Sequence, residues 1–264
     1  MRLKNARVIV TGASQGIGRA IAVEFGRRGA RLALASRNRS ALEELAASIK
    51  AEGGSAVVIP TDVTAEGAVK QMVDEAIREL GGIDILVNNA GRGMSATIGD
   101  ASAADVEALF GLNVLAAAAA IRAVIPIMRA QRSGMVINIS SMAGRVVVPR
   151  IGYYSASKFA LTAIGDALRM EEGHRGIKVM NVFPGTTRSN FGENRLGTQG
   201  RQAHQVLPPV SAEKVARQIA RAVGLDQRSV YISWFPDRAG LALNWLAGWA
   251  VSGVLGWWAR RAQT

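Results

Sequence analysis

The feature that most constrains the fold is a glycine-rich turn near the amino terminus, between a short apolar run and a helix-forming stretch. The run Val8–Thr11 leads into this turn, and the residues from Gly16 to Gly29 read as a helix. Glycine permits a tight turn and a close backbone approach to a pyrophosphate, and the start of a helix favours negative charge. Alone, such a turn could be purely structural. Its position after the first strand predicts a cofactor contact through Gly12, Ser14, Gln15, Gly16, Ile17 and Gly18.

Short apolar runs alternate with helical stretches along the rest of the chain. Strands are predicted at 8–11, 32–35, 56–59, 83–87, 135–139, 178–183 and 230–234, and helices at about 16–29, 40–52, 65–80, 103–131, 154–173 and 211–223. Continuous apolar runs are typical of parallel strands covered on both faces. We therefore predict an α/β fold, a Rossmann-like doubly wound parallel sheet of about seven strands with helices on both faces. Pro126 is expected to kink or end the long helix.

The end of the second predicted strand discriminates between the two nicotinamide cofactors. Folds of this kind that use NAD(H) place an acidic residue here to bind the ribose 2′-hydroxyl. This chain has Ser36 followed by Arg37, with Arg39 nearby. A guanidinium suits a 2′-phosphate in charge and geometry, so Ser36 and Arg37 predict NADP(H), with NAD(H) the less favoured cofactor. The alternative is that Arg37 merely begins a surface helix.

Tyr154 and Lys158 stand four residues apart in a predicted helix and therefore share one face. A free tyrosine has a pKa of about 10, which is poorly matched to proton transfer at neutral pH. A cation held close to it lowers that pKa. Tyr153 falls on a different face from Lys158. The pair alone could be two unrelated helix residues.

Other motifs accompany this pair in one fixed order, and together they resemble the short-chain dehydrogenase/reductase family over residues 4–235. The matching pieces are the glycine turn at 11–18, Asp62-Val63, Asn88-Asn89-Ala90-Gly91, Asn113, Ser140-Ser141, Tyr154 with Lys158, and Pro184-Gly185. Several motifs in order are far more specific than any one of them.

The resemblance implies a role for each matching residue. Tyr154 is implied as the general acid or base, and Lys158 as the residue that lowers its pKa and binds the nicotinamide ribose. Ser141 is implied to hold the substrate oxygen, with Ser140 as the alternative, and Asn113 to position a proton-relaying water. The implied cofactor contacts are Asp62 and Val63 at the adenine, Asn88 at the glycine turn and adenine ribose, Ala90 and Gly91 beside it, Pro184 and Gly185 at the nicotinamide, and Ser189 at its carboxamide.

Composition excludes several other kinds of site. The chain has no cysteine and only two histidines, so no metal site or Ser-His-Asp triad is predicted. Its 32 Lys and Arg residues exceed its 20 Asp and Glu residues, which is compatible with nucleic acid, anionic lipid or an anionic cofactor. Because the arginines are scattered, with no basic helix, nucleic-acid binding is not expected.

The carboxyl-terminal tail departs from a soluble domain. Residues 239–259 carry no charge, and Arg260-Arg261 follow. As a helix this stretch would span about 31 Å, close to a bilayer core. We predict a catalytic domain at 1–236 and a membrane-associating tail at 237–264, in a cytoplasmic protein held on the cytoplasmic side of a membrane. The tail could span the membrane, lie on its surface, or pack on its own domain or a neighbouring subunit.

These features predict an NADP(H)-dependent oxidoreductase that transfers a hydride between the nicotinamide and a carbonyl or alcohol. The segment between 192 and 209, which should cover the substrate, is polar and identifies only a small or lipophilic carbonyl compound or alcohol. A homo-oligomer is expected. The alternative function is a catalytically silent scaffold that binds the cofactor; such proteins typically lose the tyrosine or the lysine, and this chain keeps both.

Overall fold

Seven parallel strands form the central sheet of the protein, whose computed structural model describes residues 1–188, 190–192, 194–197 and 209–233. Their order across the sheet is β3-β2-β1-β4-β5-β6-β9. The strands are β1 (Arg7–Thr11), β2 (Arg31–Ser36), β3 (Ser55–Pro60), β4 (Ile85–Asn88), β5 (Gly134–Ile139), β6 (Ile177–Pro184) and β9 (Ser229–Ile232). A separate pair joins β7 (Thr187–Arg188) to β8 (Val210–Ser211).

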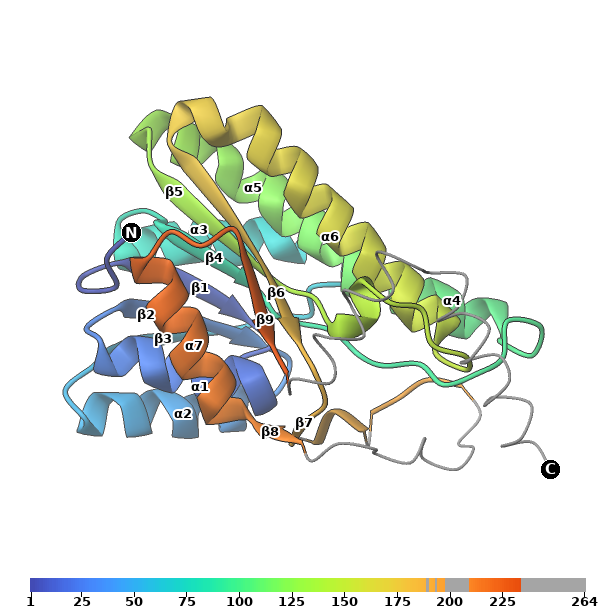
Figure 1. Ribbon diagram of the computed structural model, residues 1–264. Coiled ribbons are helices and arrows are strands. Elements are labelled where there is room, and N and C mark those ends of the chain that lie inside the picture. Colours follow the sequence, from blue (N-terminus) through green and yellow to red (C-terminus); the bar gives the residue numbers. More distant parts are fainter. Residues whose placement is uncertain (189, 193, 198–208, 234–264) are drawn as a thin grey trace.

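Helices cover both faces of this sheet, as Figure 1 shows. One face carries α1 (Gly16–Arg27), α2 (Arg39–Ala51) and α7 (Ala212–Gly224). The other face carries α3 (Ala68–Leu80), α5 (Ala116–Gln131) and α6 (Gly152–Glu172), with α4 (Ala103–Phe110) leading into α5. Four short helical turns complete the described chain: η1 (Gly111–Leu115), η2 (Met142–Gly144), η3 (Gly173–Arg175) and η4 (Asn190–Gly192).

The continuous apolar runs are explained by the two layers of helix. Successive side chains of a strand point to opposite faces, so a strand buried on both faces needs apolar residues throughout. Val8 and Val10 of β1 pack in the core under α1, α2 and α7, whereas Ile9 between them packs in the core under α3 and α5. All three are fully buried.

The strand order places a crevice at the carboxyl ends of the strands. The chain runs outward from β1 through β2 to β3 and then returns to β4 on the other side of β1. In doubly wound sheets, ligands bind where the order reverses in this way. The glycine turn after β1 and the residues after β4 therefore meet at this crevice.

The predicted fold is confirmed, and the structure corrects the description of the long helix. Its regular hydrogen bonding is interrupted at Gly111–Leu115, where one turn takes π-helical geometry. Pro126 lies inside α5, which continues to Gln131. The predicted end of the last strand, Trp234, lies outside the described residues, and β9 ends at Ile232.

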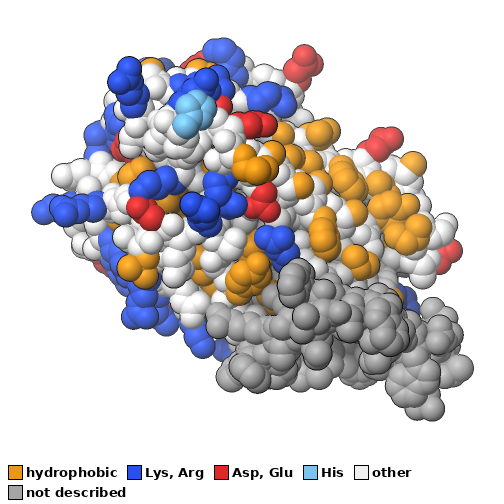
Figure 2. Space-filling view, turned by 45° about the horizontal axis from the view of Figure 1, so that its top comes forward, with side chains coloured by type: hydrophobic (Ala, Val, Ile, Leu, Met, Phe, Trp, Pro, Cys, Tyr) orange, Lys and Arg blue, Asp and Glu red, His pale blue; other side chains and the backbone are white. Residues whose placement is uncertain are grey.

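Surface character differs along the side formed by α5 and α6. Hydrophobic side chains occupy a broad part of this surface, and Lys and Arg side chains gather toward one end (Figure 2). Exposed apolar residues here include Leu115, Phe159 and Met170.

Within the described residues, one helical run, Ala103–Gln131, is long and apolar enough to cross a membrane. Half of its most apolar window is buried inside the fold, as expected for a core helix. The tail at 237–264 and its predicted boundary at 236 lie outside the described residues.

Candidate active site

The glycine turn leaves an open, positively polarised helix start at the crevice. Gly12 and Gly16 have φ angles of 64° and 57°, in the region that favours glycine. A Cβ on Gly18 would lie 2.3 Å from the Gly12 carbonyl oxygen, so no side chain fits there. Helix α1 has no side-chain hydrogen bond from its cap residue Gln15 and no acidic residue in its first turn. Its free N–H groups suit a pyrophosphate.

The residue that holds this turn in place is Asn89, not Asn88 as the resemblance implied. The Asn89 side-chain amide donates to the carbonyl oxygens of Thr11 and Gly12, at 2.9 and 3.0 Å. Asn88, the last residue of β4, instead donates to the side chain of Asn138 at 3.0 Å, inside the sheet. Since neighbouring strand residues point in opposite directions, an error of one position reverses where the amide is directed. Asn89, and not Asn88, therefore contacts the glycine turn.

The part of the crevice at the ends of β2 and β3 combines a short hydroxyl with guanidinium groups. Ser36 closes β2, and its buried hydroxyl has no hydrogen-bond partner among the described residues. Arg37 beside it is exposed. Asp62 after β3 accepts hydrogen bonds from the Thr64 N–H and hydroxyl, and these bonds lower the Asp62 pKa. The nearby charges of Arg37 and Arg92 lower it further, so Asp62 is ionised at neutral pH.

Arg92 was not identified from the sequence, although it directly follows the motif that ends at Gly91. Its backbone is held on both sides by Asn113, whose Oδ1 accepts from the Arg92 N–H at 2.9 Å and whose amide donates to the Arg92 carbonyl at 3.0 Å. The Arg92 Nε atom is buried with no partner among the described residues. The position of Arg92, a charged residue directly after a motif at the end of a strand, is the feature of the sequence that could have indicated it.

Tyr154 and Lys158 lie one turn apart on α6, at the crevice. The Lys158 Nζ atom is 5.9 Å from the centre of the Tyr154 ring and donates to the Ile139 carbonyl at 2.9 Å. A Cβ on Gly91 would be 3.4 Å from Lys158 Nζ and 3.0 Å from Asn113 Oδ1, so these groups adjoin one another. Burial lowers the pKa of Lys158 to about 8.

The pKa of Tyr154 is raised in this structure, contrary to the predicted lowering by Lys158. Burial of the phenol is the main cause, and a hydrogen bond with Ser141 and the charge of Arg195 partly oppose it. Lys158 does not lower the Tyr154 pKa here, because an amine with a pKa of about 8 is already neutral at the pH where the phenol ionises. The phenol is therefore protonated at neutral pH.

The two serines after β5 have different surroundings. Ser140 is buried, and its hydroxyl contacts the Lys158 carbonyl and the Thr162 hydroxyl at 3.1 and 2.9 Å. Ser141 caps η2 by accepting from the Ala143 N–H at 3.1 Å, and its hydroxyl is close enough to Tyr154 to lower the pKa of that phenol. Ser141 is thus the serine that lies beside the phenol, and Ser140 fastens α6 to the sheet.

Asn113 lies in the π-helical turn Gly111–Leu115 and links two parts of the site. Its amide donates to the Ser157 hydroxyl at 3.0 Å on α6, besides its two bonds with Arg92. Such turns are frequent at functional sites because they redirect backbone groups. The water predicted at Asn113 stays a prediction.

The other predicted residues that the structure describes lie around the same crevice. The Ala90 N–H donates to the Thr11 hydroxyl at 3.2 Å, and Val63 packs at the edge of the core. Pro184 ends β6, and the Gly185 N–H donates to the Ile232 carbonyl at 2.9 Å. Ser189 and most of the substrate-covering segment lie outside the described residues.

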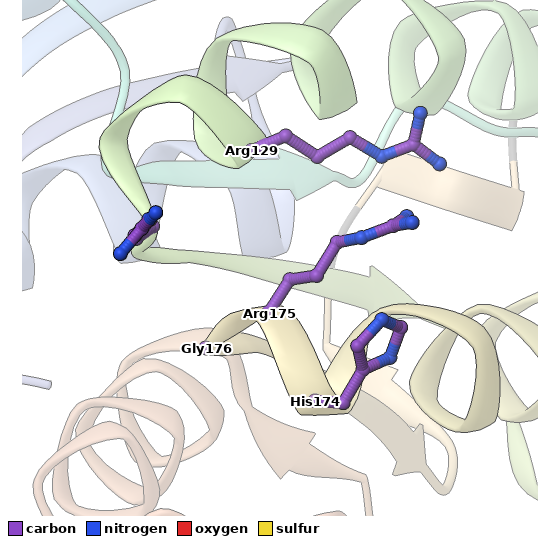
Figure 3. Close-up of a pocket in the computed structure, with 5 residues that line it drawn as sticks. Arg129, His174, Arg175 and Gly176 are labelled. Carbon is purple, nitrogen blue, oxygen red and sulfur yellow. The ribbon is translucent and has the colours of Figure 1, made fainter.

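A separate cavity of about 580 Å³ lies at the amino-terminal ends of the strands, before the starts of β5 and β6. It is lined by Arg129, Arg132, His174, Arg175 and Gly176. Figure 3 shows the Arg129 and Arg175 side chains extending in the same direction from two neighbouring segments. Both hydrogen-bond with Glu172, which lowers the pKa of Glu172 to about 2. These residues contact none of the predicted catalytic groups, and the crevice at Tyr154 remains the candidate active site.

Comparison with known proteins agrees with this geometry. Residues 6–199 match the family model described as short chain dehydrogenase. The chain is 32% identical over 246 residues to the ketoacyl reductase HetN of Nostoc sp., covering 93% of this chain and 84% of that protein. It is also 32% identical to dehydrogenase/reductase SDR family member 7B of Mus musculus, over 93% of this chain and 78% of that protein.

Solved structures show the same fold. A short chain dehydrogenase/reductase from Burkholderia phymatum, in complex with NAD, superposes with a TM-score of 0.82 at 26% identity, covering 92% of this chain and 94% of that one. An alcohol dehydrogenase from Thermococcus sibiricus, complexed with 5-hydroxy-NADP, has a TM-score of 0.76 at 23% identity, covering 85% of this chain and 94% of that one; it supports the fold alone.

Proposed function

Because the chain belongs to the short-chain dehydrogenase family of oxidoreductases, we propose that it transfers a hydride between NADP(H) and a carbonyl or alcohol. The observation that carries this proposal is the meeting of Tyr154, Ser141 and Lys158 beside the glycine turn, at the carboxyl end of the sheet. No other described cluster joins a proton donor to a site that fits a dinucleotide.

The residues of the crevice fit a bound dinucleotide phosphate. The open start of α1 would hold the pyrophosphate, and Gly12 and Gly18 let the turn pack closely against Asn89 and Ala90, which fixes the position of that helix start. The unpartnered Ser36 hydroxyl and the exposed Arg37 guanidinium would bind a 2′-phosphate, which favours NADP(H). When bound, the cofactor supplies the hydride, and the protein supplies orientation and a proton.

The protonated state of Tyr154 favours reduction of a carbonyl. A phenol with a raised pKa keeps its proton at neutral pH and can donate it to the substrate oxygen as hydride arrives at carbon. The Ser141 hydroxyl, beside the phenol, would donate a hydrogen bond to the same oxygen and stabilise its developing charge. Lys158 is largely protonated below pH 8 and can return a proton toward the phenol.

A catalytically silent scaffold is the second candidate, and activity separates the two. Purified protein is mixed with NADPH or NADH and a panel of aldehydes and ketones, and the loss of the reduced cofactor is followed by its absorbance. Oxidation of NADPH that depends on a carbonyl compound, and exceeds oxidation of NADH, supports the proposal. Tight binding of NADPH with no oxidation across the panel would instead support the scaffold.

We also propose a cytoplasmic protein whose tail at 237–264 associates with a membrane, on the basis of the uncharged, Trp-containing stretch 239–259 within it. Assembly into a homo-oligomer is a further proposal, which the exposed Leu115, Phe159 and Met170 support and light scattering would test. Nucleic acid is not proposed as a partner.

A further inference from the structure

The short segment Arg195–Gly197 is held over the active site by backbone contacts. Leu196 pairs with Met94 in a parallel bridge: its N–H donates to the Gly93 carbonyl at 3.0 Å, and its carbonyl accepts from the Ser95 N–H at 2.9 Å. A Cβ on Gly197, which has a φ of 86°, would lie 2.5 Å from the Ser95 carbonyl oxygen. The position of Arg195 therefore follows from the backbone just after the cofactor motif.

Gly93 lets two side chains close over this edge of the site. A Cβ on Gly93 would lie 3.1 Å from Arg195 Cγ and 3.1 Å from Phe191 Cε1. The Phe191 ring in turn lies 6.0 Å from the Tyr154 ring, centre to centre, at an angle of 60°. Arg195 and Phe191 thus stand together at the side of the catalytic phenol.

The wall next to Arg195 is apolar. Met94, Ala96 and Leu109 form a small buried cluster, against which Tyr153, Tyr154 and Leu196 pack. Arg195 is exposed, and none of the described carboxylates forms an ion pair with it. Its charge nevertheless reaches the site, because it contributes to the pKa of Tyr154.

We propose that Arg195 binds an anionic group of the substrate, so that the preferred substrate is a lipophilic carbonyl compound that carries a carboxylate. The guanidinium would form paired, charge-assisted hydrogen bonds with the carboxylate, while the apolar wall holds the hydrocarbon part. This inference rests on the proposed oxidoreductase function and specifies its substrate class.

The first test compares a medium-chain oxo-carboxylic acid with its neutral methyl ester. For the wild type, kcat/KM should be about ten- to a hundredfold higher for the acid, the gain expected from a bidentate ionic hydrogen bond. Arg195→Gln should remove this preference and keep turnover of the ester, and Arg195→Lys should retain part of it. Arg122→Gln, an exposed arginine on α5, serves as the matched control and should behave as the wild type.

The second test needs no turnover and separates the two hypotheses. Octanoate and octanamide are titrated calorimetrically into NADPH-saturated protein. Wild type should bind octanoate at least tenfold more tightly, and Arg195→Gln should bind the two equally. Equal binding by the wild type, or a preference that survives in Arg195→Gln, would overturn the inference. Tighter binding of octanoate through Arg195, combined with no carbonyl reduction in the first test, would support the anion site at Arg195 and refute the proposed function.

Discussion

Replacing Lys158 by methionine should abolish turnover and, at the same time, stabilise the folded protein at neutral pH. The Lys158 side chain is only 4% exposed, and the described structure gives its ammonium one hydrogen bond, to the Ile139 carbonyl. A buried charge with so few partners favours the unfolded chain, where water solvates it. Activity and stability therefore oppose one another at this position.

The magnitude follows from the pKa of Lys158. Burial lowers it from 10.5 to about 8. At about 1.4 kcal/mol per pKa unit, the charged form is destabilised by about 3 kcal/mol in the folded protein at neutral pH. Methionine has a similar length and no charge, but it loses the hydrogen bond to Ile139, which costs about 1 kcal/mol. The expected net stabilisation is about 2 kcal/mol.

The effect has a defined pH dependence. Between about pH 8 and 10.5 the unfolded chain keeps the Lys158 proton that the folded protein has released, so wild-type stability rises with pH in this window. The advantage of Lys158→Met should therefore nearly vanish at about pH 9.5. Urea unfolding followed by circular dichroism at pH 7 and at the higher pH measures both values, with the exposed Lys50→Met as control. A variant less stable than wild type at pH 7, or a difference that does not change with pH, would refute the reasoning.

Three further predictions concern the cofactor and the tail. Arg37→Asp should lower the ratio of kcat/KM for NADPH to that for NADH at least tenfold; an unchanged ratio would remove Arg37 from the 2′-phosphate site. Gly18→Ala places a Cβ 2.3 Å from the Gly12 carbonyl and should weaken NADPH binding, measured by fluorescence titration, whereas Gly99→Ala, which has open space, should not. The 264-residue chain should float with liposomes, and a protein lacking 239–264 should not. A 264-residue chain that stays in the soluble fraction when liposomes are present would contradict membrane association.

The sequence was sufficient to predict the sheet because strands buried on both faces need continuous runs of apolar residues. Runs such as Val8–Val10 are apolar at every position, whereas a half-exposed strand would alternate apolar and polar residues. The turn at Gly12 was equally visible, since its backbone conformation restricts the residue type. The break at Gly111–Leu115 was not visible, because a change in backbone hydrogen bonding leaves the apolar pattern of the long helix intact.

The predictions that were wrong at the site concern the orientation and burial of side chains, which the residue types alone do not determine. Asn88 and Asn89 carry the same side chain, and only the phase of β4 decides which one reaches the glycine turn. The pKa values of Tyr154 and Lys158 depend on how deeply the two groups are buried, which helical spacing does not determine. Arg195 stands in a polar segment, and it reaches the site only through the backbone bridge from Leu196 to Met94.

The central claim is that the Tyr154 phenol delivers the proton that accompanies hydride transfer. The most direct measurement is a single-turnover experiment in which protein saturated with NADPH is mixed with a carbonyl substrate, for Tyr154→Phe and for the matched control Tyr153→Phe. The account predicts that both variants bind NADPH as the wild type does, and that hydride transfer falls by at least a hundredfold in Tyr154→Phe alone, within the usual range for loss of a general acid. Hydride transfer at the wild-type rate in Tyr154→Phe would contradict it.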